Sequence, residues 1–229
     1  MSKLFKQWIT DTFISKTNDQ LSHTSLSDGK YFVPNDNKIL TTFYSKYIDA
    51  LHNNEKLHLV ERHLDYGPII IDLDFKFKKE KIKRQITFEH IKHVVEQYNK
   101  IIKKVLNITE DFRFESFIFQ KPKPYANGSC VKDGVHIMYP FICTPPSVQF
   151  IIRKKIVTQF NNNQYFKPLD VINKYEDIFD KAVIQQNGWI MYGSSKPNND
   201  PYKLNYIFNS SLELLPLDKY NLLAISAIL

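Results

Sequence analysis

The sequence predicts an α+β fold, because helical and strand-like segments follow one another without a regular strand–helix–strand repeat. Several segments place apolar residues at the 3.6-residue spacing of amphipathic helices, and shorter ones alternate apolar and polar residues as half-buried strands do. The chain has 229 residues, of which 43% are hydrophobic and 14% aromatic. This length and composition predict one domain or two closely packed subdomains, and argue against disorder, collagen and coiled coil.

Residues 1–65 are expected to form a smaller N-terminal α/β subdomain. Phe43, Tyr47 and Leu51 have helical spacing, with Thr41 or Thr42 as the candidate cap. The expected elements are a helix over 3–15, turns around a short strand within 27–37, a helix over 41–51 and a strand over 57–60.

Residues 66–229 are expected to form the larger core. The strand over 68–77 begins with three isoleucines, Ile69 to Ile71, as a buried strand does, and then alternates. Thr87 begins a long helix whose apolar stripe continues to about Leu106. The other expected elements are strands over 112–120, 134–139, 189–192 and 204–208, a Pro/Gly loop over 121–133, a helix over 147–160 and an apolar tail from residue 212.

Positive charge is clustered along the chain. Lys and Arg number 31 against 24 for Asp and Glu, which gives a net charge of +7. Basic residues gather in 75–84, in 121–132 and in 153–155, and such clusters interleaved with aromatics are typical of polyanion binders. A solvated turn or helix face explains the same clusters without any ligand.

The chain is expected to act inside the cell and away from membranes. No run of about 18 apolar residues occurs, and the first 21 residues lack the apolar centre of a signal peptide. The two cysteines, Cys130 and Cys143, are too few for a disulfide framework or a four-thiolate zinc site. A reducing compartment fits this content best.

The first candidate site is the pair Asp72 and Asp74, directly after the isoleucine run. Residues two apart on a strand face the same side, about 7 Å apart. Beside an apolar core these carboxylates lose solvation and repel each other, so they need a cation. Hard oxygen ligands suit Mg²⁺ or Mn²⁺, which phosphoryl-transfer enzymes use. The alternative is an exposed strand end with ordinary surface acids.

A second candidate lies around His136. Gly134 and His136 share one face of a strand, and Lys132 stands at its start. A histidine and a lysine on one edge could hold a triphosphate. The alternative is a sheet histidine hydrogen-bonded to a neighbour.

The third candidate runs from Asp180 to Lys196, with the sequence DKAVIQQNGWIMYGSSK. Asp180 could be a third carboxylate of the metal site, although an Asp before a helix can equally be an N-cap. Asn187 turns the chain into a strand. Lys196 follows Ser195 in a small-residue loop, which suits a phosphate contact.

Taken in order, the three patterns resemble the archaeo-eukaryotic primase superfamily. They are a strand with paired Asp, then a G-x-H strand, then an Asp followed by Asn, Trp and Y-G-S-S-K. The sequence is most similar to the N-terminal primase domain of the primase–helicase proteins of nucleocytoplasmic large DNA viruses, and is also similar to eukaryotic primase-polymerases. The resemblance spans residues 69–197, and the third motif is its most specific part.

The resemblance implies a primase catalytic fold, with a mixed or antiparallel RRM-like sheet flanked by helices. It also implies a template-dependent nucleotidyltransferase that makes primers for DNA replication by two-metal phosphoryl transfer. Asp72, Asp74 and Asp180 would hold Mg²⁺ or Mn²⁺. The residues that would bind the incoming nucleotide are Lys132, Gly134, His136, Asn187, Ser195 and Lys196.

The implied partners are a single-stranded DNA template, nucleoside triphosphates and a helicase domain or subunit. The template would lie along a basic groove, with Phe75, Phe77 or Tyr125 as stacking surfaces. A viral protein of this kind would work in the host cytoplasm at replication sites. The sequence has no zinc motif and no ATP-binding loop, so those modules are expected outside this chain.

The chain departs from the family pattern at several positions. Gly134 stands where many relatives have a small hydroxyl residue, and Ile184 where many have Tyr. Several relatives carry an Arg near Ile190, for which Lys181, Arg62 or Lys30 would have to substitute.

Two other functions stay open. One is a catalytically inactive nucleic-acid-binding module of a replication protein. The other is a metal-dependent glycosyltransferase, which also uses D-x-D. A phosphatase of the D-x-D-x-[TV] kind is disfavoured, because Lys76 stands where the small residue belongs.

Overall fold

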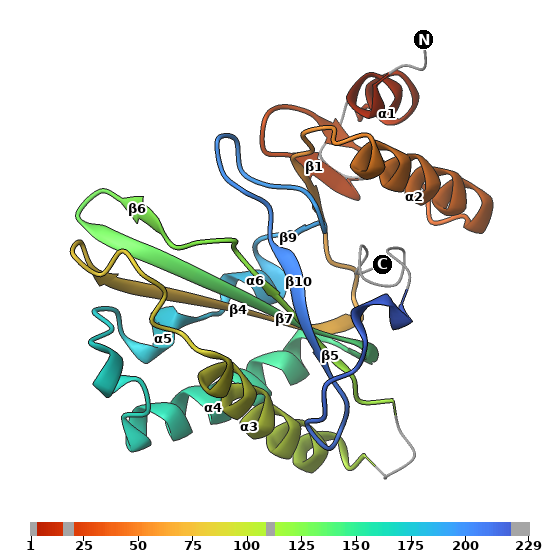
Figure 1. Cartoon of the computed structure of the whole chain (residues 1–229). Coiled ribbons are helices and arrows are strands. Elements are labelled where there is room, and N and C mark those ends of the chain that lie inside the picture. Colours follow the sequence, from red (N-terminus) through yellow and green to blue (C-terminus); the bar gives the residue numbers. More distant parts are fainter. Residues whose placement is uncertain (1–3, 16–20, 109–112, 221–229) are drawn as a thin grey trace. The chain divides into compact units, whose positions relative to one another are not determined.

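The computed structural model describes residues 4–15, 21–108 and 113–220 (Figure 1). Their contacts divide them into two compact units. The first contains the described residues up to Leu64, the segment 187–202 and Tyr220, and the second contains the described residues within 65–186 and the segment 203–219. The first unit is thus built from separate stretches of chain. The predicted domains, 1–65 and 66–229, stay a prediction.

The first unit contains two helices and a four-stranded antiparallel sheet. Its elements are α1 (Phe5–Phe13), β1 (His23–Ser25), β2 (Lys30–Tyr31), α2 (Asn37–His52), β3 (Leu59–Glu61) and β9 (Trp189–Ile190). The strand order is β2-β1-β3-β9. An apolar core centred on Phe43 and Tyr47 packs the helices against the sheet.

The second unit is larger and holds a six-stranded sheet. Its strands are β4 (Gly67–Lys78), β5 (Ser116–Gln120), β6 (Tyr125–Asn127), β7 (Cys130–Thr144), β8 (Phe179–Asp180) and β10 (Lys203–Phe208). Its helices are α3 (Phe88–Leu106), α4 (Pro146–Asn163), α5 (Tyr175–Ile178) and α6 (Ala182–Gln185), with 3-10 turns η1 (Lys167–Leu169) and η2 (Leu217–Lys219). The order is β10-β5-β7-β4-β8, and β6 pairs with β7. All these strand pairs are antiparallel, which confirms the predicted α+β class.

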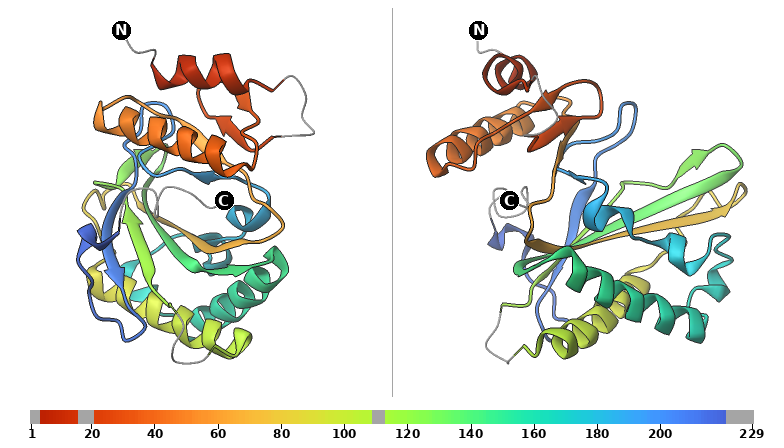
Figure 2. Two further views of the ribbon diagram at one scale, coloured as in Figure 1. Left: turned by 90° about the vertical axis from the view of Figure 1, so that its right-hand side faces the viewer. Right: turned by 180° about the vertical axis from the view of Figure 1, so that it is seen from behind.

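Helices α3 and α4 lie along one face of this sheet (Figure 2). The alternation of β4 explains why. Leu73, Phe75 and Phe77 are buried in the core that contains the apolar stripes of both helices, while Asp72 and Asp74 are only partly buried. Burial of each such aromatic side chain contributes about 2–3 kcal/mol. The polar residues of β4 therefore face away from the helices.

The pairing of β4 with β7 has one break. Pro68 pairs with Cys143, but the next residue, Ile69, pairs with Tyr139, so residues 140–142 of β7 have no partner on β4. From Ile69 to Lys78 the register then continues without interruption.

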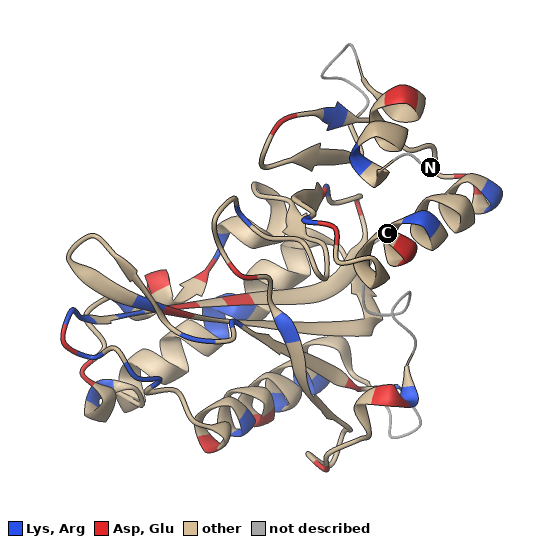
Figure 3. Cartoon of the chain, turned by 45° about the horizontal axis from the view of Figure 1, so that its top comes forward, with Lys and Arg blue, Asp and Glu red and all other residues tan. Residues whose placement is uncertain are grey.

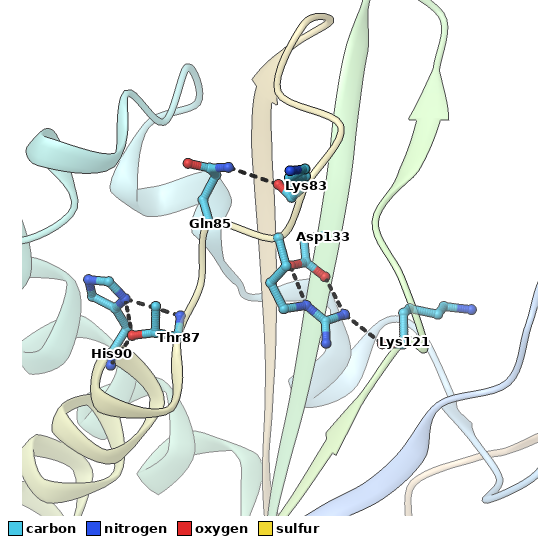
Figure 4. Close-up of polar contacts among 7 residues, drawn as sticks. Lys83, Gln85, Thr87, His90, Lys121 and Asp133 are labelled. Carbon is cyan, nitrogen blue, oxygen red and sulfur yellow. Dashed lines mark hydrogen bonds and ion pairs between the residues drawn. The ribbon is translucent and has the colours of Figure 1, made fainter.

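The start of α3 is confirmed and the start of α2 is wrong. Thr87 caps α3 by accepting the amide of His90, whose ring nitrogen accepts the amide of Thr87 in return (Figure 4). Helix α2 begins earlier than predicted, because the carboxylate of Asp36 accepts two backbone amides. The hydroxyls of Thr41 and Thr42 instead donate to carbonyls within the helix.

The loop predicted over 121–133 is wrong in part. Residues 125–127 form β6 and β7 begins at Cys130, so the two strands form a hairpin there. Strand β1 and the short helices α5 and α6 were not predicted. Residues 221–229 of the predicted apolar tail lie outside the described residues.

Within the described ranges, none of the helices combines the length and the apolar composition that crossing a membrane requires.

Candidate active site

Three predicted carboxylates face one side of the larger sheet. Asp72 and Asp74 lie two apart on β4. The short strand β8 pairs with β4 so that Asp180 is the direct partner of Asp72. Direct partners in an antiparallel pair lie about 4.5–5.5 Å apart at Cα and point to the same face. The pairing of a segment more than a hundred residues away thus brings the third acid beside the first two.

The neighbouring strand β7 brings the predicted phosphate-binding residues to the same face. His136 is the partner of Asp72, Gly134 the partner of Asp74 and Lys132 the partner of Lys76. The ring Nε2 of His136 lies 3.5 Å from Oδ1 of Asp72. One row across three strands therefore reads Asp180, Asp72, His136.

Two contacts hold the segment that carries Asp180. Its carboxylate Oδ1 accepts the amide of Ala182 at 2.9 Å, although the N-cap residue of the following helix α6 is Lys181 and not Asp180. The guanidinium of Arg153 on α4 donates to the carbonyls of Phe179 and Glu176, both at 2.7 Å. Arg153 thus fixes the backbone directly before Asp180. The sequence showed only a basic cluster at this position.

Asn173 fixes the free edge of β4 next to Asp74. Its amide donates to the carbonyl of Asp74 at 2.8 Å, and its Oδ1 accepts the amide of Lys76 at 2.9 Å. The backbone of Ile172 adds a further bond to the carbonyl of Lys76. This loop segment continues the edge where β8 ends. No local sequence pattern reveals a side chain that makes hydrogen bonds to the edge of a strand as the backbone of a neighbouring strand would.

An ion pair with one fully buried partner supports the opposite face of β7. Asp133 is fully buried, and Arg84 donates to both of its carboxylate oxygens, at 2.9 and 3.0 Å (Figure 4). Burial raises the pKa of Asp133, and the Arg84 contacts act in the opposite direction. Arg84 also donates to the carbonyl of Lys121. The pair therefore ties the basic segment after β4 to the strand that carries Lys132, Gly134 and His136.

The carboxylates of Asp72, Asp74 and Asp180, which we call the carboxylate row, fit a divalent cation. Both their donor chemistry and the strand register that brings them to one face suit such an ion. Carboxylate oxygens are the hard ligands that Mg²⁺ and Mn²⁺ prefer. As the side chains stand, no three His, Cys, Asp or Glu residues of the described segments form a group close enough to hold a metal ion. The three carboxylates would have to turn toward a shared ion to bind it.

The other predicted nucleotide-binding residues belong to the first unit. The carbonyl of Asn187 lies 2.9 Å from Nε2 of His63. Ser195 is buried and its backbone contacts Leu57 and His58, whereas Lys196 is exposed. Of the proposed substitutes for the missing Arg, Lys181 adjoins Asp180, while Arg62 and Lys30 are residues of the first unit.

The prediction of Phe75 and Phe77 as stacking surfaces is wrong. Both are 1% exposed and lie in the helix-facing core, because they alternate with Asp72 and Asp74 along β4. Tyr125 is only partly buried and is the partner of Lys132. Burial and the charges of Asp74 and Asp72 raise the pKa of Tyr125, so its hydroxyl lies in the field of both carboxylates.

Comparison with known proteins finds one matching family and several similar viral proteins. Residues 22–208 match the model of the family described as C962R protein N-terminal AEP domain. The chain is 40% identical, over 80% of its length, to a protein of Acanthamoeba polyphaga mimivirus named "Putative helicase L207/L206". Similarly named proteins, 121R of Invertebrate iridescent virus 3 and 184R of Invertebrate iridescent virus 6, are 27% and 26% identical over 80% and 88% of this chain. The chain spans about a fifth of each of these relatives, namely 19%, 20% and 23%.

Proposed function

The chain belongs to the family of C962R-type N-terminal archaeo-eukaryotic primase (AEP) domains, and from this premise we propose that it is a template-dependent nucleotidyltransferase that synthesises primers on single-stranded DNA. Family membership and the viral relatives support a primase-type function in replication. The same membership favours this function over a D-x-D glycosyltransferase.

The observation that carries the proposal is the position of Asp72 between Asp180 and His136. Strand pairing places each of them directly beside Asp72, on the face turned away from the helices. Three carboxylates and a histidine on one face combine cation ligands with a group that can contact phosphate. A surface that only bound nucleic acid would gain nothing from this concentration of negative charge.

In this proposal Asp72, Asp74 and Asp180 hold two Mg²⁺ or Mn²⁺ ions. When bound, such ions lower the pKa of an attacking 3′-hydroxyl and stabilise the leaving pyrophosphate. In this proposal His136, whose ring Nε2 lies 3.5 Å from Oδ1 of Asp72, contacts the phosphates of the incoming nucleotide. Lys132 offsets the negative charge of these phosphates.

The resemblance adds Asn187, Ser195 and Lys196 as nucleotide-binding residues of the first unit. Gly134 opposite Asp74 leaves that position of the row without a side chain. Lys196 is the exposed cation of this set and is the most direct to test, by Lys196→Ala and the Michaelis constant for nucleotide.

The names of the relatives support a helicase as the working partner. These proteins are about five times as long as the segment they share with this chain. We place the enzyme with a helicase domain or subunit at viral replication sites in the host cytoplasm. Its substrates would be nucleoside triphosphates and a single-stranded DNA template.

The test is nucleotide addition by purified protein on a single-stranded DNA template, with and without a primer, in Mg²⁺ or Mn²⁺. Asp180→Asn is expected to abolish incorporation and to leave the fold intact. Asp177→Asn is the matched control, because Asp177 is exposed on the adjacent α5 and undergoes the same charge change.

Equal activity of wild type and Asp180→Asn would show that Asp180 is not a ligand. A wild-type protein that binds single-stranded DNA but adds no nucleotide under any of these conditions would instead favour the inactive binding module.

A further inference from the structure

Two lysines face each other on the candidate active-site face of the sheet. Lys76 of β4 is the direct cross-strand partner of Lys132 of β7, and Tyr125 of β6 is the partner of Lys132 on the other side. The three residues thus form a row across three strands. This row lies two residues beyond the row that contains Asp74 and Gly134, about 7 Å along the strand.

The facing lysines repel each other. Like charges directly opposite on neighbouring strands destabilise a sheet by roughly 0.2–1 kcal/mol. Within the part of the chain that the structure describes, neither ammonium group has an ion pair or a hydrogen bond, although both side chains are partly buried. An anion held between the two ammonium groups would remove this repulsion.

The backbone around this row is held firmly. Asn173 bonds the carbonyl of Asp74 and the amide of Lys76, and Ile172 bonds the carbonyl of Lys76. On β7, Asp133 directly after Lys132 is anchored from the opposite face by Arg84. Both lysines therefore stand at fixed strand positions and not on a mobile turn. Figure 3 shows how the basic residues, in blue, and the acidic residues, in red, are distributed along the ribbon.

We propose that Lys76 and Lys132 form a binding site for one phosphate group beside the carboxylate row. The phosphate comes from the triphosphate of the nucleotide or from the backbone of a nucleic-acid strand. The choice between these two sources rests on the proposed function, whereas the binding of phosphate does not. Tyr125 borders the site and gives the sugar or base attached to that phosphate an aromatic surface.

The experiment measures binding in EDTA, so that no divalent ion at the carboxylates contributes. The probes are inorganic tripolyphosphate and an oligothymidylate strand. The variants are Lys76→Met, Lys132→Met and the double variant, since methionine keeps an unbranched apolar stem and removes the charge. Lys79→Met is the matched control, because Lys79 is an exposed lysine in the turn after β4.

Each single variant is expected to weaken the binding of one probe roughly tenfold, and the control variant is expected to weaken it less than about twofold. The affinity of the double variant should fall by less than the product of the two single fold-changes, because both lysines bind the same phosphate. For the strand, each variant should also reduce the salt slope of binding by about one. Without phosphate, neither single variant should lower the melting temperature, since each removes a repulsion.

A loss confined to tripolyphosphate assigns the site to the nucleotide, and a loss confined to the oligothymidylate assigns it to the strand. Unchanged binding of both probes in Lys76→Met, or a wild type that binds neither, overturns the proposal. An inactive Asp180→Asn together with normal binding in the lysine variants would reject this site and keep the proposed function.

Discussion

Each unit of the molecule places a histidine opposite an acid on neighbouring antiparallel strands. In the first unit His23 faces Glu61, with Nε2 3.8 Å from Oε1 and both side chains fully buried. In the second unit His136 faces Asp72 at 3.5 Å, and the side chain of Asp72 keeps 20% of its surface exposed. The cross-strand pair is thus the same in kind.

The residue on the other side of the acid makes the difference. Glu61 has Trp189 as its second partner, and the hydroxyl of Tyr44 donates to Glu61 at 2.8 Å, so a hydroxyl and an aromatic residue lie beside the acid. Asp72 has Asp180 as its second partner, which adds a negative charge. Glu61 thus lies beside an aromatic residue and a hydroxyl donor, whereas Asp72 lies beside a second acid, and two neighbouring carboxylates need a cation.

The largest expected effect tests whether the two acids have different roles, by neutralising each acid without changing its shape. Asp72→Asn should reduce nucleotide addition at least about a thousandfold, roughly 4 kcal/mol of barrier, and leave the melting temperature nearly unchanged. Glu61→Gln should leave the rate within about threefold and destabilise the fold by about 1–3 kcal/mol, since it disturbs a buried network. Rates and melting curves of both variants provide the measurement. A Glu61→Gln protein with full stability and no activity would refute the division of roles.

The second effect concerns the support of Asp180 in the second unit. Arg153→Ala removes two hydrogen bonds from the backbone before Asp180. The divalent-ion concentration that gives half-maximal activity should rise about 10–100-fold, as with other residues that orient metal ligands. Arg153→Lys should restore part of the loss. Lys154→Ala, an exposed cation on the same helix, is the control and should leave the titration unchanged.

The third expected effect is the pH dependence of the stability that His23 contributes to the first unit. Burial lowers the pKa of His23 from its ordinary 6.5 to about 3, so the native state keeps the ring neutral while the unfolded chain takes up a proton. Stability from this residue is present above pH 6.5 and is lost as the pH falls toward 3, by about 2 kcal/mol at pH 5. Both tryptophans, Trp8 and Trp189, belong to the first unit, so their fluorescence reports its unfolding.

The wild type should therefore show a fluorescence transition that moves to lower denaturant as the pH is lowered from 7 to 5. His23→Gln should lose this dependence and His52→Gln, at the end of α2, should keep it. An identical pH response in His23→Gln would assign the loss to other groups.

The smallest expected effect concerns the edge of β4. Asn173→Ala removes the bonds to the backbone of Asp74 and Lys76 and should lower the free energy of unfolding by about 1–2 kcal/mol. Asn199→Ala, whose amide contacts only Pro197 in an exposed loop of the first unit, should cost less than about 0.5 kcal/mol. Denaturant titration of both variants gives the comparison, and equal losses would show that Asn173 does not support the strand.

The sequence predicted the parts of the fold that local chemistry determines. The isoleucine run and the alternation after it located β4, and Thr87 marked the start of α3. The same alternation, carried one step further, would have placed Phe75 and Phe77 in the core and not on the carboxylate face. The start of α2 was missed because the apolar spacing that we used begins at Phe43, about two turns after the cap at Asp36.

The candidate site was less accessible to sequence reasoning. The residues Asp72, Asp74, His136 and Asp180 were identified from their types and order, but the register that makes Asp180 the partner of Asp72 depends on long-range pairing. Arg153 and Asn173 act through backbone groups of segments far along the chain, which no periodicity reveals. Lys76 drew attention only as part of a basic run and as an argument against a phosphatase, and its position opposite Lys132 follows from the register between β4 and β7.

The break in pairing at residues 140–142 has a consequence for length variation. A residue gained or lost there leaves the pairs from Ile69 to Lys78 in place. A deletion between Ile69 and Asp72 would instead exchange the two faces, turning carboxylates into the core and Leu73 and Phe75 outward.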